Sequence, residues 1–161
     1  MKRIQKIMEH PLFIACIEKN KMAEVNRRFC HHDIEHFLLV SHMMYIMCLE
    51  RQLSYSKDVI YAVGLLHDIG RYKQYEDGTS HDIVSVEIGE RILSESNFVD
   101  CEIQIISDAI LGHRGNRKMD SESLADILYI ADKSSRYCSL CKVSADCNWS
   151  EEKKKMHLNW L

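Results

Sequence analysis

The polar and apolar residues of this chain follow the period of α-helices, and the two-residue alternation typical of strands is weak throughout. Pro11 suits a first helical turn, and Gly70 suits a helix end. Asp33, Ser80 and Asp100 suit N-caps. The sequence therefore predicts an all-α fold. We expect about six to seven helices, over residues 11–25, 33–53, 56–67, 80–94 and 100–113, from Asp120 or Ser121 to about Arg136, and in a short last segment capped by Ser150.

Composition supports this prediction and bounds the size of the protein. The 161 residues include only 6 Gly and 1 Pro, and such a low content of helix-breaking residues favours helices. No linker, repeat or low-complexity segment divides the chain, so we expect one domain over residues 1–161. Its motifs fall within about residues 30–136, and a cysteine-containing tail follows over residues 137–161. Residues 71–79 are polar and include an Asp-Gly turn signal, which predicts a loop.

The charge balance and the cysteine content limit the partners and the compartment. A formal net charge of −3 argues against an extended nucleic-acid footprint, which needs a basic face. No apolar run of about 18 residues predicts a membrane span, and no signal peptide follows the basic residues at the start. The count of 7 cysteines is odd, which is more typical of reduced thiols or metal ligands than of a disulfide framework. We therefore expect a cytoplasmic protein without membrane or nucleic-acid partners.

Residues of metal-ligand type stand at the expected helix ends and on one helix face. Asp132 falls on an apolar stripe with Leu124, Leu128 and Ala131, so its carboxylate is expected to be buried. A buried charge needs compensation, which a metal ion would supply. Asp68 stands at the C-terminal end of a helix, where a carboxylate also calls for a nearby cation. The candidate ligands are His36, His67, Asp68, His81, His113 and Asp132.

Each of these residues also has an ordinary explanation. A single histidine near a helix end is more often a cap or a surface residue than a ligand. Asp132 could pair with Lys133 or Arg136, and Asp68 could be a solvated helix end. The combination of all six on five expected helices, with one adjacent His-Asp pair, favours the metal site.

The same residues stand in motifs that resemble the HD-domain superfamily of metal-dependent phosphohydrolases. The motifs are His36 within HDIEHFLLVSHM, the His67-Asp68 pair within AVGLLHDIG, and Asp132 within YIADKSS. The resemblance covers roughly residues 30–136. It implies a helical bundle in which these four residues hold one metal ion.

A binuclear branch of this superfamily has two more histidines between the His-Asp pair and the last Asp. His81, in SHDIVSVEIGERIL, and His113, in AILGHRG, match those places. The resemblance then implies two ions bridged by Asp68, with His67 and Asp68 as catalytic residues beside a metal-activated water. Imidazole and carboxylate ligands suit iron or manganese, and also zinc or nickel. The chain looks similar to small bacterial HD proteins, including di-iron dinucleoside tetraphosphate hydrolases.

The chain departs from the pattern of its resemblance at two points. Many binuclear HD sequences have Lys after the HDIG stretch, where this chain has Arg71, and no Glu of the kind found in some mononuclear members follows the pair. His31 and His32 are close enough to His36 to contact the ligands. Several cations suit phosphate oxygens, although each is also explained as a solvated surface residue. They are Arg71, Arg114, Arg117, Lys133 and Arg136.

A cysteine-rich stretch, CSLCKVSADC, follows the last of these motifs. Its first step, C-x2-C, has the spacing of metal ligands. Cys30 lies six residues before His36, and Cys138 lies six residues after Asp132, so antiparallel helices would bring both thiols to one end of the bundle. We expect a structural zinc, with a redox cluster or simple reduced thiols as alternatives. The expected ligands are Cys30, Cys138, Cys141 and Cys147.

The resulting hypothesis is a metal-dependent phosphohydrolase that acts on a nucleotide or another small phosphorylated molecule. Small size and net acidity argue against a polymer substrate. Two alternatives stay open. One is a di-iron oxygenase of the HD type. The other is a metal-binding sensor or interaction module without turnover, which the cysteine tail would suit.

Overall fold

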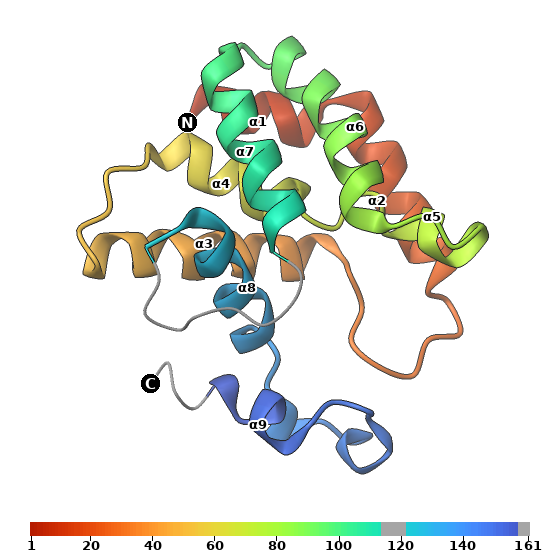
Figure 1. The fold of residues 1–161 in the computed structure, drawn as a ribbon. Helices are drawn as coiled ribbons and strands as arrows, with labels where there is room; N and C mark the ends of the chain where they lie inside the picture. The colour runs from red at the N-terminus through yellow and green to blue at the C-terminus, as the bar shows by residue number, and fades with distance from the viewer. Residues whose placement is uncertain (114–121, 158–161) are drawn as a thin grey trace.

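A computed structural model describes residues 1–113 and 122–157, and over these residues the chain is helical. No strand occurs in the described ranges, so the predicted all-α fold class is confirmed. The longer helices form a bundle, and a segment of short helical turns lies beside it (Figure 1). The elements are α1 (Lys2–Glu9), α2 (Pro11–Ala23), α3 (Ile34–Glu50), α4 (Lys57–Leu66), α5 (Arg71–Glu76), α6 (His81–Glu95), α7 (Asp100–Gly112), α8 (Leu124–Ser134), η1 (Cys138–Leu140), η2 (Ser144–Asp146) and α9 (Glu151–Lys154).

Two of the predicted helix starts are fixed by the capping side chains that the sequence indicated. The Asp33 carboxylate accepts a hydrogen bond from the backbone N–H of His36 at 2.9 Å and caps α3. Ser150 Oγ accepts one from the backbone N–H of Lys153 at 3.3 Å and caps α9. Such bonds satisfy amide groups that have no partner within the first helical turn.

Other boundaries differ by a residue or two from those expected. Ser80 precedes α6 but makes no side-chain capping bond, and Asp100 is the first residue of α7 instead of its cap. Helix α8 begins after Ser123, whose hydroxyl accepts from the backbone N–H of Asp126. The expected starts at Asp120 and Ser121 lie outside the described residues.

The prediction of a loop over residues 71–79 was wrong for its first part, because Arg71–Glu76 forms α5. A tertiary contact explains the difference. Asn20, fully buried on α2, accepts a hydrogen bond from the backbone N–H of Tyr72 at 2.7 Å and donates one to the backbone carbonyl of Asp68 at 3.0 Å. The buried Tyr72 ring adds apolar packing to this turn. Local polarity alone could not indicate a helix that depends on a residue fifty positions away.

Helix α4 is the central element of the bundle. Every residue from Val59 to Leu66 is buried, and the helix packs against α1, α3, α6, α7 and α8. A helix that is apolar on all sides belongs in the interior, which accounts for its continuous run of apolar residues. Its last turn leads directly into His67 and Asp68. The most buried helix therefore delivers the His-Asp pair to the centre of the molecule.

The C-terminal segment, which we define as residues 137–157, lies beside the loop between α2 and α3 (Figure 1). Arg28 of that loop pairs with Asp146 of η2, with Nη2 and Oδ2 2.7 Å apart.

None of the helices in the described ranges combines the length and apolar character that crossing a membrane requires.

The contact between α3 and α4 leaves no room for a side chain at Gly64. A Cβ there would lie 2.7 Å from Ser41 Cα and 2.8 Å from Ser41 N, which are backbone atoms that cannot move aside cheaply. Gly64→Ala should therefore reduce the free energy of unfolding by about 1–3 kcal/mol, measured by urea denaturation.

Gly89 in α6 provides the matched control for this prediction. A Cβ at Gly89 would meet Leu66 Cδ1 at 3.6 Å, an ordinary contact. Gly89→Ala should leave stability unchanged or raise it by up to about 1 kcal/mol, because alanine favours helix. Equal effects of the two substitutions would contradict the close approach of α3 and α4.

Candidate metal centre

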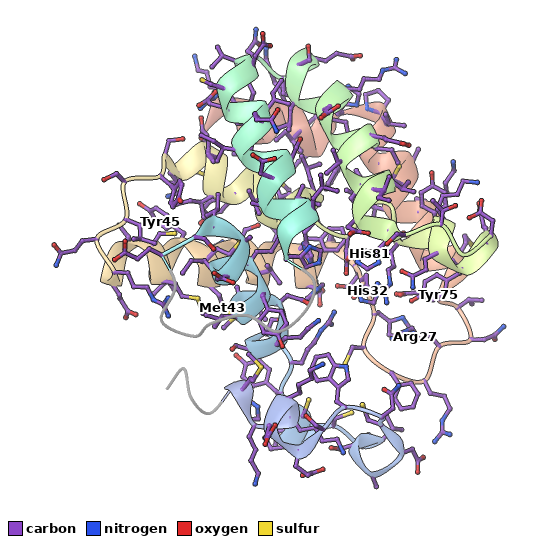
Figure 2. The ribbon with its side chains drawn as sticks, viewed as in Figure 1. Arg27, His32, Met43, Tyr45, Tyr75 and His81 are labelled. Atoms are coloured by element: carbon purple, nitrogen blue, oxygen red, sulfur yellow. The ribbon has the colours of Figure 1, made fainter. Side chains whose placement is uncertain are left out.

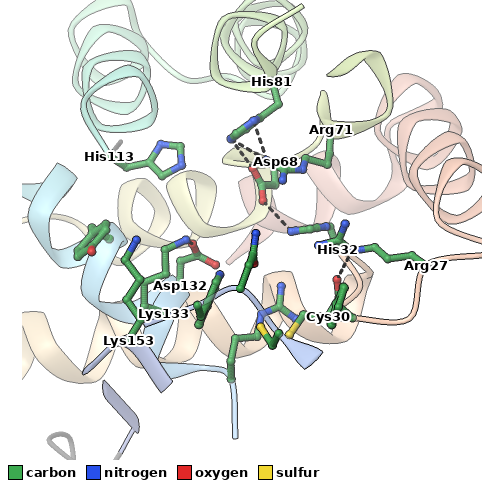
Figure 3. Close-up of a pocket in the computed structure, with 16 residues that line it drawn as sticks. Arg27, Cys30, His32, Asp68, Arg71, His81, His113, Asp132, Lys133 and Lys153 are labelled. Atoms are coloured by element: carbon green, nitrogen blue, oxygen red, sulfur yellow. Dashed lines mark hydrogen bonds and ion pairs between the residues drawn. The ribbon is translucent and has the colours of Figure 1, made fainter. Parts of the chain in front are cut away.

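The six candidate ligands converge in the interior of the bundle from five different helices. All six side chains are buried, and Figure 3 shows His81, His113, Asp68 and Asp132 around one pocket. Their ligand atoms form two groups, and within each group the atoms all lie within 4.8 Å of one another. One group is His36, His67 and Asp132, and the other is Asp68, His81 and His113.

Short distances between ring nitrogens and carboxylate oxygens define the geometry. His36 Nε2 lies 3.3 Å from Asp132 Oδ1, and His81 Nε2 lies 3.0 Å from Asp68 Oδ1. His67, a member of the first group, also lies near the second, with Nε2 3.8 Å from Asp68 Oδ2 and 4.0 Å from Asp132 Oδ1. Asp68 thus turns one carboxylate oxygen toward His81 and the other toward His67, so it faces both groups at once.

Two of the histidine rings are fixed by the helices that carry them. Nδ1–H of His67 donates to the backbone carbonyl of Gly64 at 2.8 Å, and Nδ1–H of His113 donates to that of Ile110. Each acceptor is a carbonyl at a helix C-terminus, where carbonyl groups lack partners within the helix. The bonds fix the tautomer and leave the Nε2 lone pair directed at the centre.

The other two rings are fixed by side chains. His36 Nδ1 lies 3.2 Å from Ser135 Oγ, and this hydroxyl donates onward to the backbone carbonyl of Asp132 at 2.7 Å. His81 Nδ1 lies 2.6 Å from Gln74 Oε1 and 2.8 Å from Arg71 Nη1. Both rings therefore also present Nε2 to the centre, as metal-binding histidines commonly do.

Burial sets the protonation of these groups. It lowers the pKa of His67 to about 3 and also lowers the pKa values of His36 and His113. At neutral pH these rings are therefore neutral, which is the form that binds metal ions. Burial alone would raise the pKa values of Asp68 and Asp132, but the histidines that face them, together with Lys133 at Asp132, hold both well below the usual range.

Three buried atoms at the centre have no hydrogen-bond partner. They are His36 Nε2, His67 Nε2 and Asp68 Oδ1. Buried polar atoms without a partner are rare and require an explanation. Asp132 pairs through Oδ2 with Lys133 Nζ at 2.6 Å, one of the ordinary explanations considered for it, but Oδ1 still faces His36. Neutral imidazole nitrogens and charged carboxylate oxygens fit divalent transition metals, and such ions would satisfy these atoms.

His32 and Glu24 form a buried support beside Asp68. His32 Nε2 lies 3.4 Å from Asp68 Oδ2, while its Nδ1 lies 2.5 Å from Glu24 Oε1. Tyr75 donates to the same Glu24 oxygen at 2.7 Å. Figure 2 shows His32, Tyr75 and His81 gathered on one side of the bundle. The sequence marked His32 as a contact of the ligands. It gave no sign of Glu24, an ordinary charged residue at a helix end.

A cavity of about 350 Å³ opens onto the centre (Figure 3). Among the predicted phosphate-binding residues, Arg71, Lys133 and Arg136 line it, whereas Arg114 and Arg117 lie outside the described residues. Arg27 and Lys153 also line the cavity, and no sequence motif indicated either. In the described part of the chain, five cationic side chains thus surround the carboxylates Asp68 and Asp132.

Two of the four cysteines of the predicted zinc site, Cys30 and Cys147, line this cavity. Cys138 is buried in η1 and Cys141 is exposed after it. All four are free thiols. They are not among the groups whose ligand atoms all lie within 4.8 Å of one another in the described ranges.

The fold and the centre define a helical protein with buried His/Asp groups that could hold metal ions, and comparison with known proteins gives the family. The family model described as "HD domain" matches residues 33–137, so the chain belongs to the HD domain family. This family lies within the superfamily of metal-dependent phosphohydrolases. A Clostridium beijerinckii (strain ATCC 51743 / NCIMB 8052) protein, described as "Uncharacterized protein", is 41% identical over 158 residues, which cover 98% of this chain and 99% of that protein. No solved structure matches the chain.

Glu24 should make the metal-free protein sensitive to acid. Burial alone would raise its pKa, but hydrogen bonds and charge from His32 lower it to about 2, compared with an ordinary value of 4.5. Because the folded pKa is depressed, this group contributes stability above the ordinary value and loses it as the pH falls toward the folded value. Urea unfolding should therefore show a smaller loss of stability for Glu24→Gln than for the wild type between neutral pH and about pH 3. Parallel losses in the two proteins would contradict this role.

Proposed function

We propose that the protein is a metal-dependent phosphohydrolase that acts on a nucleotide or another small phosphorylated molecule. One observation carries the proposal: two buried His/Asp groups lie next to each other, with Asp68 near ligands of both, beside a cavity with cationic walls. The ligands suit a metal centre and the walls suit an anionic substrate. Membership of the HD domain family supports the same reaction class.

The ligand groups support a site for two ions. His36, His67 and Asp132 would hold one ion, and His81 and His113 the other, with Asp68 shared between them. Asp68 is suited to bridging because its two oxygens face different groups. When bound, iron, manganese or a similar divalent ion supplies an acidified water and charge stabilisation for a phosphoryl group.

The cations of the cavity would position the phosphate. Arg71 Nη1 lies 2.8 Å from His81 Nδ1, so its guanidinium is placed beside the centre. Lys133 lies against Asp132 on the opposite side of the pocket (Figure 3). Guanidinium and ammonium groups on two sides of a partly enclosed pocket would hold the phosphate in one orientation and reduce its contact with water.

Size and aromatic lining support a nucleotide among the small substrates. A volume of about 350 Å³ lies in the lower part of the range for small-molecule pockets. Phe29, Tyr129 and Trp149 line the cavity together with the cations. Aromatic faces suit stacking with a planar base, while the charged groups suit the phosphate.

Hydrolysis is tested by supplying the purified protein with manganese, iron or zinc and measuring phosphate or nucleotide release. The substrates are phosphomonoesters, dinucleoside polyphosphates and cyclic dinucleotides. We expect turnover of at least one class, and a loss of more than about 100-fold in Asp68→Asn, because that change weakens a shared ligand. Asp108→Asn, an exposed change on α7, is the matched control and should retain activity. Oxygen consumption by the iron-loaded protein without hydrolysis would favour the oxygenase alternative.

Metal content measured by elemental analysis tests the two-ion arrangement separately from activity. His81→Ala and His113→Ala should each lower the content by about one ion, and Asp68→Ala by about two. These differences are counted apart from any ion bound by cysteines. His42→Ala, an exposed change on α3, should leave the content unchanged. Wild-type content in both His81→Ala and His113→Ala would contradict a second ion.

A further inference from the structure

We propose that four cysteine thiols form another metal site, distinct from the His/Asp centre, and that this site takes a zinc ion. The ion would join the C-terminal segment to the loop between α2 and α3 and so complete one wall of the cavity. The ligands are Cys30, Cys138, Cys141 and Cys147.

Two contacts place the cysteine-bearing segments side by side. Arg28 pairs with Asp146, the residue before Cys147, at 2.7 Å. Arg136 donates through Nη1 to the backbone carbonyl of His31, the residue after Cys30, at 2.9 Å. In each contact, both residues therefore lie within two positions of a cysteine, although the two segments are over a hundred positions apart in the sequence.

Successive turns set the spacing of the other thiols. The backbone N–H of Cys141 donates to the carbonyl of Cys138 at 3.2 Å, which closes the C-x2-C step. Two more turns follow, from Cys141 to Ser144 at 3.2 Å and from Ser144 to Cys147 at 3.3 Å. These turns keep the path from Cys138 to Cys147 compact, so the three thiols of the segment can lie near one another.

The electrostatics of Cys138 agree with this proximity. Burial is the main cause that raises the pKa of its thiol, and charge on Cys30, Cys147 and Cys141 raises it further. All three other thiols are therefore near enough to affect Cys138.

The C-terminal segment buries few apolar side chains of its own. Within its residues, the buried apolar side chains are those of Cys138 and Met156. The pair between Arg28 and Asp146 is mostly exposed on both sides, and such a pair adds little stability. Short segments without a core of their own are commonly held by a disulfide or a metal ion, and the thiols here are free. Tetrahedral thiolate coordination selects zinc over the oxygen-preferring cations.

The two segments that carry the four cysteines also form one wall of the cavity. Cys147, Trp149 and Lys153 belong to the C-terminal segment and line the cavity, while Cys30 and Arg27 line it from the opposing loop. Lys133 Nζ also lies 5.2 Å from the centre of the Trp149 ring. An ion held by thiols from both segments would therefore fix this wall of the cavity in place.

Metal binding by the whole protein tests the proposal directly. The reduced wild type should bind about one zinc ion beyond those of the His/Asp centre, and this ion should remain in His81→Ala and His113→Ala. Cys30→Ser and Cys138→Ser should each lose it. Cys101→Ser makes the same change at an exposed thiol of α7 and should retain it. Cobalt added to the metal-free wild type should give thiolate-to-cobalt charge-transfer absorption that these two cluster variants lack.

The rate of tryptic cleavage after the exposed Lys142 measures how firmly the C-terminal segment is held. Cleavage should be slow in the zinc-bound wild type and in Cys101→Ser, and at least about tenfold faster after chelation or in Cys138→Ser. The wild-type cobalt spectrum needs no substitution, so it decides the matter even where a variant fails to fold. Absence of thiolate-to-cobalt absorption would overturn the proposal, as would unchanged zinc content in the cluster variants or a Cys30–Cys147 disulfide. None of these results depends on hydrolytic activity.

Discussion

Two carboxylates buried side by side impose the strongest constraint on this structure. Asp68 and Asp132 are only 4% and 6% exposed, and burying an uncompensated charge is among the most unfavourable events in folding. The fold surrounds them with the ring nitrogens of histidines. Without an ion, Lys133 and weakly directed imidazole contacts supply the compensation, and some buried atoms are left without hydrogen bonds. The centre is therefore organised for cations before any cation binds.

Helix ends are the means by which the fold meets this constraint. Helix α4 is buried on all sides, and α3 and α7 pack against it. Its last turn therefore places His67 and Asp68 in the interior. Carbonyl groups left unpaired at the ends of α4 and α7 then accept the Nδ1 hydrogens of His67 and His113. These carbonyl groups, which would otherwise lack hydrogen bonds at a buried helix end, thus orient the candidate ligands. Packing and metal chemistry are satisfied by one arrangement.

The features of the site that could be predicted depend on residues close together in the sequence, whereas those that were missed depend on residues far apart in it. The apolar run before His67, the caps of α3 and α9 and the candidate ligands that converge in the interior were readable from the sequence, because each rests on local spacing or on a resemblance. Helix α5 was missed because Asn20 stabilises it from α2. Glu24, Arg27 and Lys153 were missed because an ordinary charged residue reveals its role only when folding brings it to the cavity or, for Glu24, to a buried partner. Long-range placement, more than residue type, limited the prediction.

The charge balance of the cavity links the centre to the C-terminal segment. Over the described residues, five cations and two carboxylates line the pocket, so the walls already favour an anion. Divalent ions at the centre would cancel the carboxylates and leave all the cations free to act on the substrate. A polyanionic phosphate would gain more from this field than a singly charged one. Lys153 belongs to the weakly anchored segment, whereas Arg71 and Lys133 belong to the bundle. Loosening the segment should therefore weaken substrate binding and leave the ions in place.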